Sequence, residues 1–368
     1  MSKKWVIIIS ATVLALVLVY TGTQAYGLYT TPLGPALQLA TETAVSPTLT
    51  PLVFSSAIPP TQYAVASATV PQPVCGGPPL INILLIGSDA RGDHYLYGLS
   101  DVMRLVRVDF VNQRVSMLEF PRDLWVEIPE ISDHYGITHG KLNQAYLYGN
   151  PGLGYYDGRG QGPELLAKTL DLNFGARPNH YLAVNMRTFV DMVDAIGGLD
   201  VTLPYDVDAR TSNNPDAPHY TAGPHHMDGE TSLMVARIRQ INTFGRADNQ
   251  NIVMCSLRKK LLSPSVLPRV PKLVDVFKKY VQTDFSPEQI SQLACLAPQL
   301  DAEDVVFASF PEELFKRSRM YDPTLKAETF IFDVDFNALR EYVTKFNRGE
   351  WPPFGELVEP VEDEYICE

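Results

Sequence analysis

NILLIGSDAR, at residues 82–91, is the stretch that sets the fold. Its apolar part, Asn82 to Ile86, runs into Gly87, a pattern typical of a buried strand that leads into a loop. Asp89 follows two residues later, so its carboxylate would stand at the end of that strand. The stretch therefore predicts a central strand that presents an acid at a cleft.

The segments after this strand show two kinds of apolar pattern, one typical of β-strands and one typical of α-helices. Two apolar runs at 102–110 and 115–120, joined by a polar turn, predict an antiparallel hairpin. Further strands are expected at 180–185, 305–310 and 329–334, and helices at 163–172, 187–196, 228–238, 245–262, 272–281, 287–296 and 336–346. Because strands and helices interleave, we predict an α/β fold with a mixed central β-sheet flanked by helices on both faces.

Acids and arginines recur between residues 87 and 250. They lie in five blocks: GSDAR at 87–91, GLSD at 98–101, FPRD at 120–123, RIR at 237–239 and FGRADNQ at 244–250. Two or three carboxylates can hold a divalent cation, and guanidinium groups bind phosphate oxygens in pairs. If the blocks converge, the residue types suit a metal-bound polyphosphate better than a bare anion.

These blocks, in this order, resemble the LytR-CpsA-Psr family, whose domain is also called the cell envelope-related transcriptional attenuator domain. Three further blocks match it: KLNQAY at 141–146 with Gly149, FVDMVDAIGGLDV at 189–201, and AG at 222–223 with MDGE at 227–230. The resemblance implies a membrane-anchored enzyme that moves a glycopolymer from a polyprenyl pyrophosphate carrier onto peptidoglycan. It also implies Mg²⁺, or Mn²⁺, at the pyrophosphate.

The resemblance also implies roles for individual residues. Asp89 and Asp101 match the metal-binding acids, and with Arg122 they form the expected catalytic group. The expected pyrophosphate contacts are Arg122, Arg237, Arg239 and Arg246, with Gln250 as a polar head-group contact. Lys141 and Asn143 would contact either the acceptor or the phosphate, or would lie on the surface.

Three positions depart from the family pattern. Leu99 stands where an arginine is usual, Thr243 where an acid is usual, and Asn249 where an arginine is usual. Loss of one buried charge-assisted contact costs a few kcal/mol. Arg91, Arg104 or Arg107 could compensate. Two alternatives to transfer therefore stay open, namely capture of a polyprenyl phosphate without turnover and hydrolysis of a lipid pyrophosphate.

The N-terminal region predicts an anchor and a spacer. Lys3 and Lys4 precede a charge-free, mostly apolar stretch from Trp5 to Tyr29, long enough for a spanning helix of about 20 residues. Residues 1–30 are thus expected to be a single-pass anchor in the cell membrane with the rest of the chain extracytoplasmic, although a signal cleaved after Ala25 is the alternative. Residues 31–79 read as a linker rich in Pro, Thr, Ser and Ala, 80–350 as the catalytic and lipid-binding domain, and 351–368 as an acidic tail.

Charge excludes one broad class of partner. The net charge is −12, whereas a general nucleic-acid surface would be basic, so we expect no nucleic-acid partner.

None of the four cysteines forms a Cys-x-x-Cys motif, so metal or thioredoxin-like chemistry is not expected. Outside the cytoplasm their even number favours two disulfides, and buried free thiols are the alternative. Of three possible connectivities the preferred one is Cys255–Cys295 with Cys75–Cys367.

Overall fold

The computed structural model describes residues 23–24, 26–39, 71–90, 95–210, 214–238 and 244–352. Most of the predicted anchor and linker, and the chain after residue 352, lie outside these ranges. Among the described residues, no helix is both long and apolar enough to cross a bilayer.

The centre of the fold is a mixed six-stranded sheet with the order β11-β6-β1-β2-β3-β12. Its strands are β1 (Leu80–Ser88), β2 (Ser100–Asp109), β3 (Arg114–Glu119), β6 (His180–Asn185), β11 (Gln282–Thr283) and β12 (Val305–Ala308). β1 is antiparallel to β2 and parallel to β6, β2 is antiparallel to β3, and β3 is parallel to β12. The predicted hairpin and central strand are confirmed.

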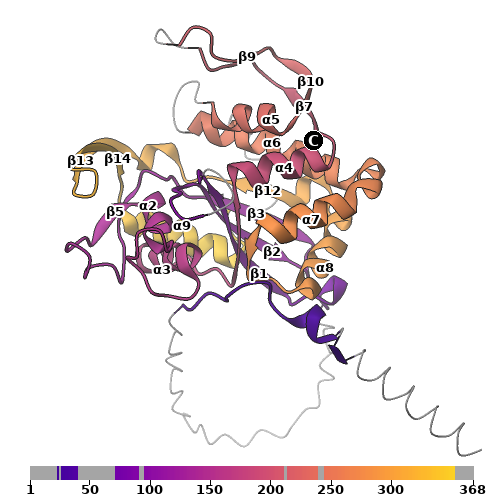
Figure 1. Ribbon diagram of the computed structural model, residues 1–368, viewed down its shortest axis with the longest axis horizontal. Helices are drawn as coiled ribbons and strands as arrows, with labels where there is room; N and C mark the ends of the chain where they lie inside the picture. Colours follow the sequence, from indigo (N-terminus) through magenta and orange to yellow (C-terminus); the bar gives the residue numbers. More distant parts are fainter. Residues whose placement is uncertain are drawn as a thin grey trace, which may run out of the picture.

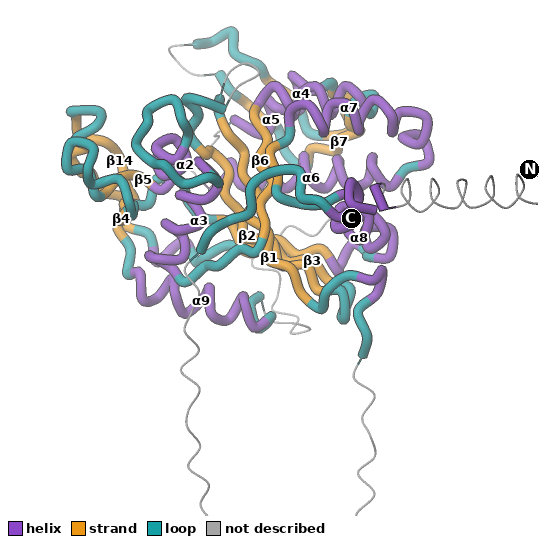
Figure 2. Tube along the Cα trace, turned by 60° about the horizontal axis from the view of Figure 1, so that its bottom comes forward, coloured by secondary structure: helices purple, strands orange, loops and turns teal. Residues whose placement is uncertain are grey.

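Helices cover both faces of this sheet, as predicted (Figures 1 and 2). Alternation along β1 divides its side chains between two cores: Leu84 and Ile86 lie in one, Ile81 and Ile83 in the other. The first core is closed by α2 (Leu142–Gly149), α3 (Gln161–Phe174) and α9 (Phe336–Arg348). The second is closed by α8 (Pro287–Leu296) and the short η1 (Val74–Gly76).

A third layer of helices stands at one end of the sheet (Figure 1, top and right). It contains α4 (Met186–Ala195), α5 (Gly229–Arg237), α6 (Phe244–Leu262) and α7 (Val270–Tyr280), with the paired strands β7 (Leu199–Leu203) and β10 (Gly223–Met227). A separate apolar core, which includes Val193, Val235 and Ile252, holds α4, α5 and α6 together with β7.

Several short elements were not predicted from the sequence. They include β4 (Trp125–Glu127) with β5 (His139–Lys141), β8 (Val207–Asp208) with β9 (His219–Tyr220), and the 3-10 turns η2 (Pro264–Arg269), η3 (Ala297–Gln299), η4 (Ala302–Asp304) and η5 (Glu312–Leu314). β13 (Lys316–Asp322) was also not predicted, whereas its partner β14 (Ala327–Asp333) matches the strand expected at 329–334.

The first described part of the predicted linker lies on the folded domain. The Leu33 N–H donates to the Phe285 carbonyl (3.0 Å), and the Gln38 N–H donates to Glu164 Oε2 (3.1 Å). Leu37 and Leu39 pack against the first core. The chain therefore crosses the domain surface between residues 33 and 39 and is not a free spacer there.

The preferred disulfide pairing is wrong. Cys75 is bonded to Cys295, with their Cα atoms 5.8 Å apart, and Cys255 is itself disulfide-bonded. The reason is tertiary: the Val74 N–H donates to the Phe110 carbonyl (3.0 Å), which fixes η1 beside the end of β2, and α8 packs against η1 there. Position in a predicted helix carries no information about which helix face meets which loop.

We predict that the Cys75–Cys295 bond contributes strongly to stability, because it closes a sequence separation of 220 residues. Cys75→Ser with Cys295→Ser should lower the free energy of unfolding by about 2–5 kcal/mol. Urea denaturation of the double variant measures this, and an unchanged denaturation midpoint would contradict it.

Candidate active site

Three strands deliver the predicted site residues to one edge of the sheet. β1 ends at Ser88 where β2 begins at Ser100, and these two residues are paired in the register. β3 runs alongside β2, and the Phe120 N–H donates to the Met103 carbonyl (2.9 Å) as the chain leaves β3 toward Arg122. Asp89, Asp101 and Arg122 therefore lie together, as the sequence predicted.

Asp89 is fixed by the backbone of Leu99. The Asp89 N–H donates to the Leu99 carbonyl (2.9 Å), and the Leu99 N–H donates to Asp89 Oδ1 (2.6 Å). Gly98 permits this contact, because a Cβ at Gly98 would lie 2.2 Å from Ser88 Oγ and 2.7 Å from the Ala90 Cβ. Residue 99 thus orients the acid through its main chain, whichever side chain it carries.

A chain of ion pairs runs inward from Asp101. Arg122 Nη1 binds Asp101 Oδ1, and Arg122 Nε lies 3.4 Å from Asp123 Oδ2. The buried Asp123 also accepts from Lys141 Nζ (2.9 Å). The Asp123 carboxylate therefore contacts both Arg122 and Lys141. Lys141 thus helps to position the charged cluster and does not lie on an open surface.

The charges around Asp89 oppose one another. Burial raises the pKa of Asp89 above its usual value, and the nearby Asp101 charge adds to the rise. The Leu99 N–H, Arg122 and Arg237 pull the pKa in the other direction. Arg237, the exposed last residue of α5, is therefore within electrostatic range of the acids.

For Arg122, burial works against the charged form, but Asp101 and Asp123 outweigh it and raise its pKa. Arg122 is thus a permanent cation at the centre of the cluster.

The donor set fits a divalent cation completed by a ligand. Mg²⁺ is commonly held by one or two carboxylates together with substrate phosphates. Asp89 and Asp101 provide two. Burial and, to a smaller extent, the Asp101 charge raise the pKa of Asp89, and a bound cation would favour its charged form. Over the described ranges, no group of three or more His, Cys, Asp or Glu side chains is placed to hold a metal by itself.

Asn143 and Gln250 bring unpaired polar atoms to the structure. Asn143 Oδ1 and Gln250 Oε1 are buried, and neither has a hydrogen-bond partner among the described residues. The Asn143 N–H donates to the Arg122 carbonyl (3.3 Å), which places the start of α2 behind the arginine. A buried unpaired amide oxygen is unusual, and a donor group on a ligand would satisfy it.

Asn249 is structural. Its side chain is fully buried, accepts from Tyr205 Oη (3.2 Å) and donates to the Ile238 carbonyl (3.1 Å) at the end of α5. An arginine in this position would lose the acceptor for Tyr205 and would have to bury its charge, whereas asparagine meets both contacts. No local pattern in the sequence indicates this role of Asn249.

Tyr95 is a second residue that sequence reasoning missed. It is buried, its Oη donates to the Tyr280 carbonyl (2.7 Å), and the Asn185 N–H donates to Tyr95 Oη (3.0 Å). It ties the loop between β1 and β2 to the ends of β6 and α7.

Other predicted residues are placed elsewhere or not at all. Arg104 is buried and forms an ion pair with Glu119 (2.7 Å), and Arg107 forms one with Asp109 (3.3 Å). Neither therefore replaces the missing family arginine. Arg91, Arg239 and Thr243 lie outside the described residues, and for Arg246 only its place in the first turn of α6 is described.

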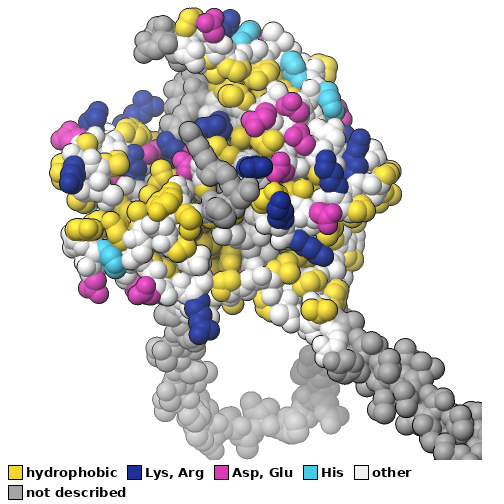
Figure 3. Space-filling model, viewed as in Figure 1, with side chains coloured by type: hydrophobic (Ala, Val, Ile, Leu, Met, Phe, Trp, Pro, Cys, Tyr) yellow, Lys and Arg dark blue, Asp and Glu magenta, His cyan; other side chains and the backbone are white. Residues whose placement is uncertain are grey.

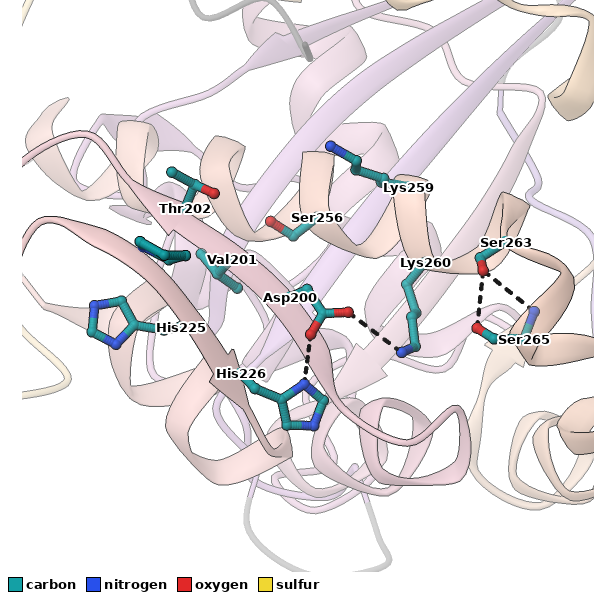
Figure 4. A pocket seen from close by; sticks show the side chains of 11 residues that line it. Asp200, Val201, Thr202, His225, His226, Ser256, Lys259, Lys260, Ser263 and Ser265 are labelled. Atoms are coloured by element: carbon teal, nitrogen blue, oxygen red, sulfur yellow. Dashed lines mark hydrogen bonds and ion pairs between the residues drawn. The ribbon is translucent and has the colours of Figure 1, made fainter.

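A pocket of about 590 Å³ lies away from this cluster, at the other end of α6 (Figure 4). Asp200 sits in it, with His226 Nδ1 at 2.6 Å and Lys260 Nζ at 3.7 Å. None of the predicted site residues lines this pocket. The chemistry suggested by the sequence is therefore not located there.

The sequence pattern of the LytR_cpsA_psr family matches residues 77–344. The regulatory protein MsrR of Staphylococcus aureus (strain COL) is 31% identical over 215 residues, or 58% of this chain and 58% of MsrR. The polyisoprenyl-teichoic acid–peptidoglycan teichoic acid transferase TagU of Bacillus cereus (strain AH820) is 29% identical over 213 residues, or 57% of this chain and 62% of TagU. The chain therefore spans about three fifths of the length of these curated relatives.

Solved structures show the same fold. The crystal structure of TagV from B. subtilis superposes with a TM-score of 0.55 at 22% identity, covering 73% of this chain and 96% of TagV. The mixed sheet with flanking helices is shared.

We predict that Asp89→Asn raises stability at pH 7. A raised carboxyl pKa means that the folded state holds the proton more tightly, so stability is lost as pH rises through the folded-state pKa. Asparagine keeps the Oδ1 acceptor for the Leu99 N–H but removes the charge. The urea midpoint should exceed the parent's at pH 7, and this gain should shrink toward pH 4.

The control is Asp133→Asn, which alters an exposed acid and should leave the urea midpoint unchanged both at pH 7 and at pH 4. A loss of stability in Asp89→Asn at pH 7 would mean that the charge of Asp89 is satisfied in the folded chain.

Proposed function

Since the chain belongs to the LytR_cpsA_psr family, we propose that it transfers a glycopolymer from a polyprenyl pyrophosphate carrier to peptidoglycan in the cell envelope. The name of its relative TagU describes a transfer of teichoic acid from a polyisoprenyl carrier to peptidoglycan. The observation that carries the proposal is the convergence of Asp89, Asp101 and Arg122 at one edge of the sheet.

The arginines supply phosphate binding. Arg122 is oriented by Asp101 and Asp123 and Arg237 lies within electrostatic range, so two cations face a region that also holds two acids. A pyrophosphate diester would exchange the Asp101 contact of Arg122 for its own oxygens. Guanidinium groups would also offset charge that grows on the leaving phosphate. Arg246 and Arg239 are proposed to join them from the segment 239–246.

The transfer step needs one base. An acceptor hydroxyl oxygen forms a bond to the sugar-proximal phosphorus, the bond from that phosphorus to the bridging oxygen breaks, and polyprenyl phosphate leaves. The hydroxyl proton goes to a carboxylate. Without a bound cation, Asp89 is suited to take it, because burial and Asp101 raise its pKa. With a cation bound, Asp89 would act as its ligand and would be a poor base.

Bound Mg²⁺ or Mn²⁺ would supply charge neutralisation at the phosphate oxygens, and Asp89 and Asp101 are the residues that would hold it. Asp101 would then bind the cation, and Arg122 would bind the phosphate.

The enzyme must work where its lipid carrier lies. A polyprenyl carrier lies in a membrane, so we propose that residues 1–30 anchor the chain there as a single-pass segment, with the domain extracytoplasmic. The Cys75–Cys295 disulfide is consistent with an oxidising compartment.

Leu99 favours a second candidate, capture of a polyprenyl phosphate without turnover. An apolar, half-buried side chain stands beside Asp89 where the family pattern has a cation. Turnover of a lipid-linked glycan separates the two functions, since capture gives binding and no product.

We predict that Arg122→Ala weakens binding of polyprenyl pyrophosphate about 10- to 100-fold, because it removes a charge-assisted contact. Transfer to a peptidoglycan acceptor should fall at least as far. Arg319→Ala, an exposed arginine on β13, is the matched control and should change neither. Unaltered lipid binding with a lowered melting temperature would make Arg122 a structural residue only.

We predict that Leu99→Arg distinguishes transfer from capture. In an intact transferase another cation, such as Arg91, already does the work, so Leu99→Arg changes turnover little and Arg91→Ala reduces it heavily. In a capture protein, Leu99→Arg tightens pyrophosphate binding or raises a very low activity. If neither variant differs from the parent in binding or turnover, position 99 does not face the phosphate.

A further inference from the structure

The segment 257–280 is positively charged, whereas the chain as a whole is negatively charged. It contains seven Lys or Arg residues and one Asp, within a protein whose net charge is −12. The end of α6, η2 and the whole of α7 form this segment. Lys259, Lys272 and Lys278 make no ion pair with any described residue. Positive charge is thus concentrated in one segment of an acidic protein.

The same surface exposes large apolar side chains. Leu267 is 70% exposed, and Leu261, Leu262, Val270 and Val274 are each about two fifths exposed. α7 has no buried residue, although it rests on α4 through its other side. In Figure 3, basic and hydrophobic side chains lie intermixed where α7 runs. Apolar residues flanked by lysines are typical of helices that lie in a membrane interface.

The surface adjoins the point where the N-terminal segment meets the fold. α7 ends at Tyr280 and leads into β11, and the Leu33 N–H donates to the Phe285 carbonyl just beyond that strand. Residues 26–30 are helical and expose Tyr26, Leu28 and Tyr29. In Figures 1 and 2 this segment leaves the domain on the side of α7 and α8.

We propose that the surface formed by residues 257–280 docks on the anionic lipid headgroups of the membrane that holds the anchor. Lysines on it meet the negative surface potential, and Leu267, Val270 and Val274 enter the interface between headgroups and acyl chains. An acidic protein partner would account for the lysines, but it would not explain why the anchor segment emerges beside them. The proposal rests on the membrane location in the proposed function.

Docking would orient the active site. Tyr95 Oη donates to the carbonyl of Tyr280, the last residue of α7, and Tyr95 belongs to the loop between Asp89 and Leu99. α4, which packs on α7, begins where β6 ends beside Ser88. A surface-bound α7 therefore holds the acid loop at a fixed height above the bilayer that carries the lipid-linked substrate.

The test uses the full chain in vesicles and follows hydrogen–deuterium exchange of residues 264–280. Exchange should be slower in phosphatidylglycerol vesicles than in phosphatidylcholine vesicles, and high salt should remove the difference. Leu267→Glu with Lys278→Glu should abolish the protection, since each unit of charge contributes roughly a factor of five near an anionic surface.

A matched control changes the same residue types on another part of the domain. Leu325→Glu with Lys316→Glu alters an exposed leucine and an exposed lysine of the β13–β14 hairpin and should leave protection intact. Equal exchange in both lipids, or equal loss of protection in the control, would overturn the proposal.

Failure of docking is distinguishable from failure of the proposed function. In detergent, Leu267→Glu with Lys278→Glu should still capture polyprenyl pyrophosphate as the parent does. Arg122→Ala in vesicles should lose capture but keep the protection of residues 264–280. Loss of both properties in both variants would contradict an independent docking surface.

Discussion

The site depends on one backbone contact, the pair of hydrogen bonds between Asp89 and Leu99. β1 and β2 are antiparallel, so the end of one strand meets the start of the other, and the contact closes the loop between them. With Gly98 lying against Ser88, this closure leaves no room for a side chain at 98. Asp101 then follows on β2 directly beside Asp89, and β3 brings Arg122 to the same edge. Every charged group of the cluster is positioned relative to this pair of strand ends.

The charges of the cluster are not fully compensated, so that a bound ligand would stabilise it. Asp101 and Asp123 compensate Arg122, and Lys141 compensates Asp123 from behind. Asp89 remains with the weakest compensation, since its pKa is raised by burial and by Asp101. A half-buried acid with too little positive charge around it is destabilising in the free protein. Such strain is characteristic of groups that act on a ligand, because the ligand's cations or protons relieve it.

Periodicity predicted the long elements, and tertiary contacts decided the rest. The apolar alternation at 82–86 and 102–110, and the periodic runs that became α3, α4, α6 and α8, are signals within one segment, so sequence revealed them. β7 and β10 are five residues each and pair across 19 intervening residues, which no local pattern encodes. The disulfide shows the same limit, because η1 and α8 are far apart in sequence and meet at the second core. In the site, the family blocks identified Asp89, Asp101 and Arg122, whereas Tyr95 acts through contacts with β6 and α7 that its neighbours in sequence do not reveal.

The departures from the family pattern have different physical meanings. Asn249 is committed to the fold, because its amide joins Tyr205 to the end of α5 in a place that water does not reach. Leu99 is not committed in this way, since its main chain alone holds Asp89 and its side chain is half-buried. Replacement by a cation is therefore structurally permitted at 99 and not at 249. In the proposed function, the charge that the family pattern has at 249 is therefore not supplied there, and phosphate binding would depend on Arg122, on Arg237 and on the proposed contacts Arg239 and Arg246.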